Sequence, residues 1–403
     1  MSPALTVEEA LARILRGAVP IADIQRRDLL AAHGQVLAEP VVSGLTQPPF
    51  DASAMDGYAA RLADLTTRPV TLRVVGEAAA GRGYRGALGA GEAVRIFTGA
   101  PVPSGADAIV IQESTERDGD RVTVLTGKPE FEHIRPAGGD FRSGELLLPA
   151  GRRLTARDIT LAAATGHAAL AVRRPPVVAI LATGDELVLP GVAPGPDQIV
   201  CSNTFGIAGM VRAAGGTPRL LGIARDTAES LAERLDQAKG ADILVTVGGA
   251  SVGDHDLVGP VLRERGMALD FWKIAMRPGK PLMYGRLGPQ HVVGLPGNPV
   301  SSLVCTRLFV IPLVRALLGL EPEPVRPLAA RAAVPLSANG PRAHYMRAKA
   351  RQGDNGQLEV TPVANQDSSL MRPLADADCL LVRPIGATAL AAGASVPVLM
   401  LDF

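Results

Sequence analysis

One loop of the sequence combines glycines with acidic side chains, a pairing that suits a phosphate group bound through a metal ion. The stretch 248–256 reads GGASVGDHD and follows the apolar run Ile243–Val247. Glycines expose main-chain amides, which bind anions next to the start of a helix. The carboxylates of Asp254 and Asp256 repel phosphate unless Mg²⁺ lies between them. In the alternative interpretation, Asp256 only caps the following helix and the glycines form a turn.

Three further loops carry acidic residues or helix-start signals directly after an expected strand. The stretch 183–186 reads TGDE. Asp226 begins the sequence DTAE, which has the spacing of a capping box, so its residues alone favour a helix cap. In LPGNPVSS, at 295–302, Asn298 is expected at the N-cap and Pro299 at the first helical position. Four such loops together indicate a polyanion site.

Alternating strand and helix signals predict the domain that positions these loops. Strands are expected at Val177–Thr183, Arg219–Ile223, Ile243–Val247 and His291–Leu295, and helices at Thr204–Ala214, Thr227–Lys239, after Asp256 and from Val300. This alternation implies helices on both faces of a largely parallel sheet, which is a three-layer α/β domain. Ligands bind beyond the C-terminal ends of the strands in such sheets, so all four loops should meet at one edge.

The rest of the chain predicts a multidomain α/β plus β protein. Residues 1–48 with 141–175 are expected to form a discontinuous, mixed helical linking domain, interrupted by a β-rich insert at 49–140. The Pro-rich stretch 321–327 marks a linker between the α/β domain, at 176–322, and a small C-terminal β-barrel at 323–403. The β-rich runs of the insert are Val70–Val75, Ala93–Thr98, Ala108–Gln112 and Val122–Leu125. At the N-terminus, Thr6 and Glu9 have the spacing of a capping box, which predicts the start of the first helix.

Composition excludes several classes of partner. The 403 residues carry a net charge of +1, so no overall excess of charge attracts nucleic acid or an anionic membrane. The longest apolar stretch, 303–320, is interrupted by Arg307, Pro312 and Arg315, and the N-terminus has no signal-peptide pattern. We therefore expect a soluble, cytoplasmic protein. The three cysteines are far apart and make no CxxC pair, which favours buried thiols over a zinc site.

A small group of cations is a second candidate for anion binding. Lys273 and Lys280 are two of only five lysines, and Arg277 lies between them. An ammonium group is a compact charge that suits a phosphate or another oxyanion, although two nearby lysines can also occur by chance. His255 and the other histidines form no triad and no metal-ligand spacing, which favours structural or surface roles.

Two stretches of the β-rich insert complete a set of motifs. SAMDGYA at 53–59 and IFTGAPVPSGADA at 96–108 read as turns from their residues alone. Together with GGD (138–140), ATGDEL (182–187), GGASVGDHD (248–256), MRPGKP (276–281) and LPGNPVSS (295–302), they make the chain similar to the molybdopterin molybdenumtransferase family, which includes the C-terminal E domain of gephyrin. The matching motifs occur in order over most of the chain.

The resemblance implies a homodimer of elongated four-domain protomers, with residues 176–322 as the molybdopterin-binding domain. It implies the last step of molybdenum cofactor synthesis, in which adenylylated molybdopterin and molybdate react, molybdenum joins the dithiolene and AMP leaves. Molybdopterin adenylyltransferase and apo-molybdoenzymes are the implied protein partners. Two alternatives remain, namely the adenylylation of molybdopterin, whose enzymes resemble the α/β domain alone, and a non-catalytic scaffold.

The resemblance and the four strand-end loops together indicate which residues form the site. Catalytic roles are expected for Asp56, Thr98, Asp140, Glu186, Asp226, Asp256, Lys273 and Arg277. Substrate binding is expected for Gly248, Gly249, Ser251, Gly253, Lys280, Pro296, Gly297, Asn298, Pro299, Ser301 and Arg347, and Mg²⁺ binding for Glu186, Asp254 and Asp256. The lysines and Arg277 would hold molybdate or phosphate oxygens. Because Asp56, Thr98 and Asp140 lie outside the α/β domain, we expect the partner subunit to supply them.

Overall fold

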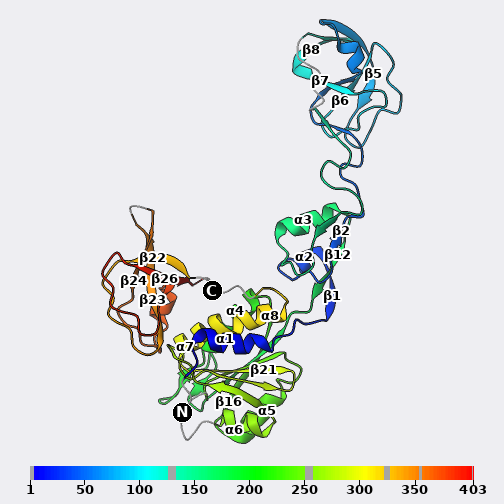
Figure 1. The fold of residues 1–403 in the computed structure, drawn as a ribbon. Coiled ribbons are helices and arrows are strands. Elements are labelled where there is room, and N and C mark those ends of the chain that lie inside the picture. Colours follow the sequence, from blue (N-terminus) through cyan, green and yellow to red (C-terminus); the bar gives the residue numbers. More distant parts are fainter. Residues whose placement is uncertain (1–3, 126–132, 250–256, 322–326, 354–355, 402) are drawn as a thin grey trace. The chain divides into compact units, whose positions relative to one another are not determined.

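The computed structural model describes residues 4–125, 133–249, 257–321, 327–353, 356–401 and 403 (Figure 1). Its contacts divide the chain into two compact units. The sheet unit comprises Met1–Gln25, Gly34–Ala38 and Ala171–Phe403, and the insert unit comprises Arg26–His33 and Glu39–Leu170. The expected multidomain α/β plus β class is confirmed, and the limits of the four expected domains stay a prediction.

A six-stranded sheet forms the centre of the sheet unit, in the order β16-β13-β17-β21-β20-β18. Its strands are β13 (Val177–Thr183), β16 (Thr217–Ala224), β17 (Ile243–Val247), β18 (Ala268–Trp272), β20 (Met283–Leu287) and β21 (Gln290–Leu295). The first four strands of the order are parallel, as predicted, whereas β20 pairs antiparallel with both of its neighbours, β21 and β18. The sequence does not predict β18, because its first three residues are exposed and leave no apolar run.

Successive residues of the central strands bury their side chains on opposite faces of this sheet. Val178 and Ile180 of β13 belong to one hydrophobic core, and Ala179 and Leu181 to another. The first face is covered by α1 (Val7–Arg16), α4 (Asn203–Ala213), α7 (Pro299–Cys305) and α8 (Ile311–Leu317), and the second by α5 (Ala228–Asp236) and α6 (Val258–Glu264) (Figure 1). A strand covered on both faces must be apolar throughout, which explains why β13 and β17 are continuous apolar runs.

The helix α1 begins at a capping box and is attached to this sheet at its C-terminal end. Thr6 and Glu9 form the predicted capping box, with Thr6 N donating to Glu9 Oε2 at 2.9 Å and Glu9 N donating to Thr6 Oγ1 at 3.2 Å. At the other end, Arg286 of β20 donates to the carbonyl of Gly17 at 2.8 Å. The apolar side of α1, including Ile14, is buried in the core of the sheet unit.

Pro299–Leu317 forms one long helix, in which a π-helical turn, Thr306–Val310, separates α7 from α8. The helix has the length and apolar composition of a membrane span, so the expectation that Arg307, Pro312 and Arg315 exclude this stretch on composition is wrong. Its most apolar window is 83% buried in the structure. The packing is therefore that of a core helix, which covers one face of the sheet.

A second sheet of the sheet unit closes into a barrel, which confirms the expected C-terminal barrel. Its strands are β22 (Leu328–Ala332), β23 (Ala343–Gln352), β24 (Leu358–Pro362), β25 (Cys379–Arg383) and β26 (Ser395–Met400), with the short helix α9 (Arg372–Ala375). They pair in the order β23-β24-β22-β26-β25, and β25 pairs back onto β23. The short strand β19 (Met276–Arg277) adds to β23 in parallel, so that the α/β part of the unit is joined to the barrel.

The insert unit is built on a six-stranded sheet in the order β7-β4-β6-β5-β9-β8. Its strands are β4 (Gly57–Ala60), β5 (Val70–Ala78), β6 (Glu92–Ile96), β7 (Ala108–Ile111), β8 (Thr115–Asp118) and β9 (Arg121–Val124). The turn predicted for SAMDGYA is only partly right, because Gly57–Ala60 is a buried strand that pairs on both sides. The described part of the unit also contains the 3₁₀ helices η1 (Leu62–Leu65) and η2 (Gln112–Ser114) and the helices α2 (Leu29–Ala32) and α3 (Ala156–Ala164).

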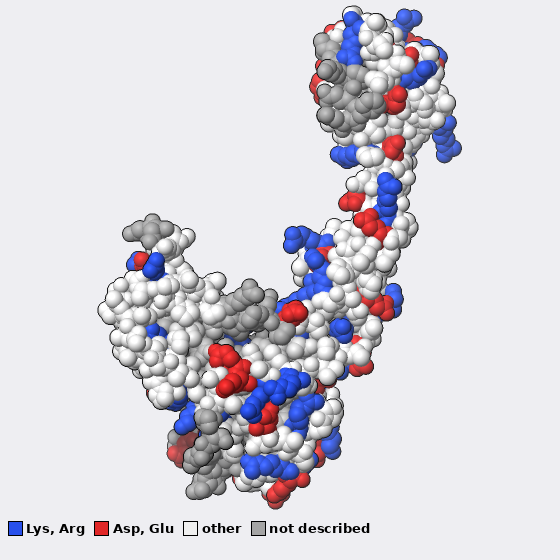
Figure 2. Space-filling view, viewed as in Figure 1, with Lys and Arg blue, Asp and Glu red and all other residues white. Residues whose placement is uncertain are grey.

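Four two-stranded ladders complete the fold. They pair β1 (Ile24–Asp28) with β12 (Ala169–Arg173), β2 (Val41–Val42) with β11 (Leu146–Leu148), β3 (Ala52–Ser53) with β10 (Ile134–Arg135), and β14 (Leu187–Val188) with β15 (Ile199–Val200). Basic and acidic side chains are interspersed on the face drawn in Figure 2, in keeping with the net charge of +1. All three cysteines are free and buried, as predicted.

Candidate functional site

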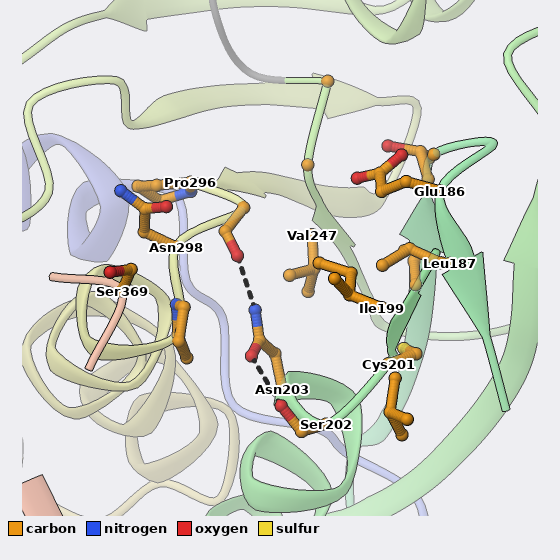
Figure 3. A pocket seen from close by; sticks show the side chains of 18 of the residues that line it. Glu186, Leu187, Ile199, Cys201, Ser202, Asn203, Val247, Pro296, Asn298 and Ser369 are labelled. Carbon is orange, nitrogen blue, oxygen red and sulfur yellow. Dashed lines mark hydrogen bonds between the residues drawn. The ribbon is translucent and has the colours of Figure 1, made fainter. Parts of the chain in front are cut away.

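A cavity of about 830 Å³, called here the strand-end pocket, lies at the edge of the sheet where four parallel strands end (Figure 3). The structure brings together in it the four loops that the sequence singles out. The predicted site residues that line it are Glu186 after β13, Asp226 after β16, Gly248 and Gly249 after β17, and Pro296, Gly297, Asn298 and Pro299 after β21. Helix starts and glycine loops meet at this edge, which is where sheets of this kind bind anionic ligands.

Gly248 lets the loop after β17 approach the end of β13 closely. Its φ of +93° is left-handed, and a Cβ atom there would lie 2.7 Å from the carbonyl oxygen of Thr183. Thr183 is buried, and its Oγ1 has no hydrogen-bond partner among the described residues. Both the backbone conformation and the close approach therefore require glycine at this position.

Two acidic side chains reach the strand-end pocket from neighbouring loops. Glu186 and Asp226 both line it, and both are exposed. The N-cap of α5 is Thr227, whose Oγ1 accepts a hydrogen bond from Ser230 N at 3.2 Å. The cap predicted for Asp226 from spacing is therefore wrong, because the next residue supplies the capping oxygen. Asp185 Oδ1 accepts from Asp226 N at 3.2 Å and thereby ties the two acidic loops together.

Two asparagines hold the wall that faces Glu186 across the pocket (Figure 3). Asn203 Nδ2, at the start of α4, donates to the carbonyl oxygen of Gly297 at 2.7 Å. Asn298 is the N-cap residue of α7, as predicted, but its side chain makes no capping hydrogen bond. Its Nδ2 donates instead to Ser368 Oγ of the barrel at 2.9 Å. The loop after β21 is thus fixed from both sides by side-chain amides.

A second cavity, of about 330 Å³, adjoins the first and shares Pro281, Pro296 and Asn298 with it. We call it the basic pocket. Its other lining residues are Arg277, Pro278, Gly279, Lys280, Ser301, Arg342, His344, Gln366 and Ser368. Three of them are cations, and no carboxylate occurs among the described residues that line it. Cations and hydroxyls without acids are the lining that a small oxyanion requires.

His344 contributes a neutral imidazole to the basic pocket. The pairing of β19 with β23 places it opposite Arg277. Its burial, together with Arg277, Arg342 and Arg347, lowers the pKa of His344 to about 4. At neutral pH the ring therefore adds no positive charge and can accept or donate one hydrogen bond.

Lys273 and Arg347 line neither pocket. Lys273 follows β18 with a φ of +81°, and its main-chain N donates to the carbonyl of Leu282 at 2.9 Å. Arg347 of β23 is 1% exposed, and its guanidinium donates to main-chain carbonyls of the barrel. A side chain this buried contacts the protein interior, which differs from the substrate contact that the resemblance implies.

Asp56, Thr98 and Asp140 belong to the insert unit. Asp56 Oδ1 accepts hydrogen bonds from Thr98 N and Thr98 Oγ1, both at 2.8 Å. These two bonds, with a smaller contribution from Arg95, hold the pKa of Asp56 below its usual value. Asp140 is exposed, in a turn whose Asp140 N donates to the carbonyl of Gln47. Asp56 and Thr98 therefore form one hydrogen-bonded, negatively charged pair, although they lie 42 residues apart in the sequence.

The rest of the glycine loop lies outside the described residues. This applies to the predicted site residues Ser251, Gly253, Asp254 and Asp256, and also to His255. Within the described ranges, no group of three or more histidine, cysteine and acidic side chains has metal-binding geometry. Glu186 and Asp226 supply two carboxylates to one pocket. Carboxylate oxygens, completed by substrate phosphates and water, are the ligands that Mg²⁺ prefers.

Sequence reasoning missed several lining residues. Ser202 and Asn203 carry a signal, because serine and asparagine are typical of the start of a helix. Arg342, His344 and Ser368 carry none that local patterns could reveal. They reach the basic pocket only because β19 pairs with the barrel, a contact between segments about seventy residues apart in the chain.

The fold and these cavities define a class of protein: a doubly wound α/β domain with a cavity at its strand ends and a barrel in the wall of that cavity, an arrangement typical of domains that bind phosphorylated ligands. Comparison with known families identifies the three parts. Residues 5–166 match the MoeA N-terminal region (domain I and II), 179–316 match a probable molybdopterin binding domain, and 329–401 match the MoeA C-terminal region (domain IV).

Similar proteins cover nearly the whole chain. A molybdopterin molybdenumtransferase of Nostoc sp. is 39% identical, over 97% of this chain and 92% of its own. Molybdopterin molybdenumtransferase 2 of Mycobacterium tuberculosis is 36% identical over 97% of both chains. The crystal structure of a molybdopterin biosynthesis moea protein from Pyrococcus horikosii covers 100% of both chains with a TM-score of 0.85 and 30% identity.

The chain belongs to the molybdopterin molybdenumtransferase family. It is a transferase of molybdenum cofactor biosynthesis, as the motifs indicate. The matches extend over the N-terminal and C-terminal regions as well as the α/β domain, which disfavours an adenylyltransferase resembling that domain alone.

Proposed function

We propose that this chain transfers molybdenum from molybdate to adenylylated molybdopterin, with Mg²⁺-dependent release of AMP. The observation that supports the proposal is that two adjoining cavities share a wall but differ in the charge of their lining residues. The strand-end pocket has glycine loops and acids, and the basic pocket has cations and no described acid. Their common wall, formed by Pro281, Pro296 and Asn298, would bring a bound nucleotidyl substrate next to a bound oxyanion.

The strand-end pocket supports the binding of adenylylated molybdopterin. Gly248 N donates to the carbonyl of Leu295 at 3.1 Å, so the loop would offer the main-chain amide of Gly249 to the pyrophosphate. The buried Thr183 Oγ1, which has no partner among the described residues, lies beside it. Glu186 and Asp226 have the carboxylate chemistry to hold Mg²⁺, which when bound neutralises phosphate charge. Asn203 keeps Gly297 in place, so the rim of the pocket is fixed before the substrate binds.

The basic pocket supports the binding of molybdate. Molybdate is a dianion that must approach a second anion, so the repulsion between them has to be offset by cations. Arg277, Lys280 and Arg342 supply these, and the hydroxyls of Ser301 and Ser368 can donate to oxyanion oxygens. Ser301 is only 4% exposed and lies in the first turn of α7, so the helix fixes its position in the wall of the pocket.

We also propose a cytoplasmic homodimer in which the insert unit of one copy completes the strand-end pocket of the other. Asp56, Thr98 and Asp140 carry exposed or partly exposed polar groups, and the resemblance gives them functional roles. Molybdopterin adenylyltransferase would supply the adenylylated substrate, and apo-molybdoenzymes would receive the product.

The test is an assay of the purified chain with adenylylated molybdopterin and molybdate, with and without Mg²⁺. Active cofactor is measured by reactivation of a cofactor-free molybdoenzyme, and AMP by chromatography. The proposal predicts that cofactor and AMP appear together, and that chelation of Mg²⁺ stops both. A chain that consumes ATP and free molybdopterin and releases pyrophosphate would instead be an adenylyltransferase. One that binds the adenylylated substrate without releasing AMP would be a scaffold or carrier.

A further inference from the structure

One loop of the barrel forms a wall of both pockets. Ser369 lines the strand-end pocket, and Gln366 and Ser368 line the basic pocket. Residues 365–370, called here the wall loop, therefore contact both cavities, and any displacement of this loop would change both.

The wall loop is attached to the start of α7. Val300 N donates to the carbonyl oxygen of Ser368 at 3.1 Å, and Asn298 Nδ2 donates to Ser368 Oγ at 2.9 Å. Within the loop, Asp367 Oδ1 accepts from Ser369 N at 2.9 Å and from Ser369 Oγ at 2.8 Å. One serine thus fixes the loop to the α/β domain, and one aspartate fixes the turn that presents both serines.

Arg347 holds the wall loop from the barrel side. Its Nη1 donates to the carbonyl of Leu370 at 2.8 Å, and its Nη2 donates to the carbonyls of Asn365 at 3.0 Å and Asp367 at 2.9 Å. The side chain of Gln366 adds two bonds to the main chain of Arg347, accepting from its N and donating to its O, both at 2.9 Å. A planar guanidinium can reach three carbonyls at once, which a lysine ammonium on a flexible stem cannot reproduce.

The burial of Arg347 indicates that its hydrogen bonds to the wall loop stabilise the structure. The side chain is 1% exposed, and burial lowers its pKa, opposed by the charge of Asp367. A buried cation is costly unless its donors are satisfied, and the wall loop satisfies them with main-chain oxygens. The loop and the arginine therefore stabilise each other.

We propose that Arg347 is a positioning residue, which sets the wall loop so that Ser368 and Ser369 face the two pockets. The inference rests on the proposed function for its effect on catalysis, but not for its effect on the loop. The Arg347→Lys variant should show faster amide hydrogen exchange at Val300 and Ser369. Its KM for molybdate should rise about tenfold, with a smaller change in kcat.

Arg383→Lys is the matched control, because Arg383 is also a buried arginine of the barrel, 4% exposed, that donates to main-chain carbonyls. Those carbonyls belong to Ser337 and Thr388, outside the wall loop. Equal effects of the two variants on exchange at Val300 and on KM would overturn the proposal, since both would reflect a weakened barrel. A raised KM with unchanged exchange would also overturn it, because Arg347 would then act on the ligand.

Asp367→Ala tests the same inference without replacing the buried arginine, in case Arg347→Lys fails to fold. Asp367 is exposed, and its loss should speed exchange at Ser369 and raise the KM for molybdate in the same direction. The exposed Asp376→Ala, in the same barrel, should do neither. Failure of the wild type to release AMP would contradict the proposed function alone, because the exchange results would still report on the wall loop.

Discussion

Lys273 has a backbone conformation that a lysine adopts only under constraint. Its φ of +81° is the one positive value at a non-glycine position among the described residues. The left-handed region costs an L-residue about 1–2 kcal/mol, and such strain persists where the surrounding structure imposes it. Lys273 directly follows β18 and is hydrogen-bonded to Leu282, so sheet pairing imposes the conformation. A lysine at a position that favours glycine supports the role proposed for its ammonium.

Lys273→Gly should therefore stabilise the sheet unit and impair the reaction. The expected gain in the free energy of unfolding is about 1 kcal/mol, because glycine adopts positive φ without strain. Trp272 is the single tryptophan, so its fluorescence during urea unfolding measures this domain alone. Lys273→Ala keeps the strain and should lose activity without gaining stability. Full activity in both variants would show that the ammonium has no role.

At the residue scale, local patterns locate the loops but not each role within them. DTAE at 226–229 offers two oxygens for one helix cap, and the structure uses Thr227, which leaves Asp226 to line the pocket. Asn298 occupies the predicted N-cap yet bonds Ser368. Spacing cannot distinguish between these uses, because the deciding partner is adjacent in one case and about seventy residues away in the other.

At the scale of elements, a buried polar cluster connects α1 to the hairpin of β20 and β21. His291 is 2% exposed, and its Nδ1 lies 2.9 Å from the hydroxyl of Tyr284. Arg286 Nη1 lies 2.7 Å from His291 Nε2 and also donates to the carbonyl of Gly17. Burial, and next the charge of Arg286, lower the pKa of His291 to about 4, against a smaller opposing effect of Asp242.

Acid should therefore weaken this cluster. The unfolded chain binds a proton at His291 near its ordinary pKa of about 6.5, and the folded chain only near 4. The free energy of unfolding should thus fall as the pH drops through this window, by about 1–3 kcal/mol for this group. Trp272 fluorescence in urea, at several pH values, measures the fall. His291→Gln should reduce the slope of the free energy of unfolding against pH, whereas His33→Gln, at an exposed position, should not. An unchanged slope in His291→Gln would contradict this account.

Whether the sequence predicts a strand depends on how deeply that strand is buried. β13 and β17 match their predicted limits, because a strand covered on both faces must be a continuous apolar run. β18 is an edge strand with three exposed residues, and its sequence has no such run. The wall loop depends on Arg347, whose three carbonyl contacts no periodicity reveals. Sequence patterns therefore predict the sheet and its loops, whereas the barrel side of the site requires the tertiary structure.

At the scale of the whole molecule, the candidate residues are divided between the two units. Glu186 and Asp226 lie in the sheet unit, and Asp56 and Thr98 lie in the insert unit. An active homodimer in which each pocket is completed by the other copy would explain this division. We therefore propose that the strand-end pocket of one copy carries out the transfer with residues supplied by a second copy.

Mixing two inactive variants tests this claim most directly. Asp226→Asn removes a carboxylate from the pocket, and Asp56→Asn removes one from the insert unit, so each alone should release little AMP. Glu229→Gln, an exposed change in the first turn of α5, should remain active as the matched control. After subunit exchange at equal amounts, mixed dimers retain one complete site, and AMP release should recover to about one quarter of the wild-type value. No recovery on mixing, or full activity of Asp226→Asn alone, would contradict the account.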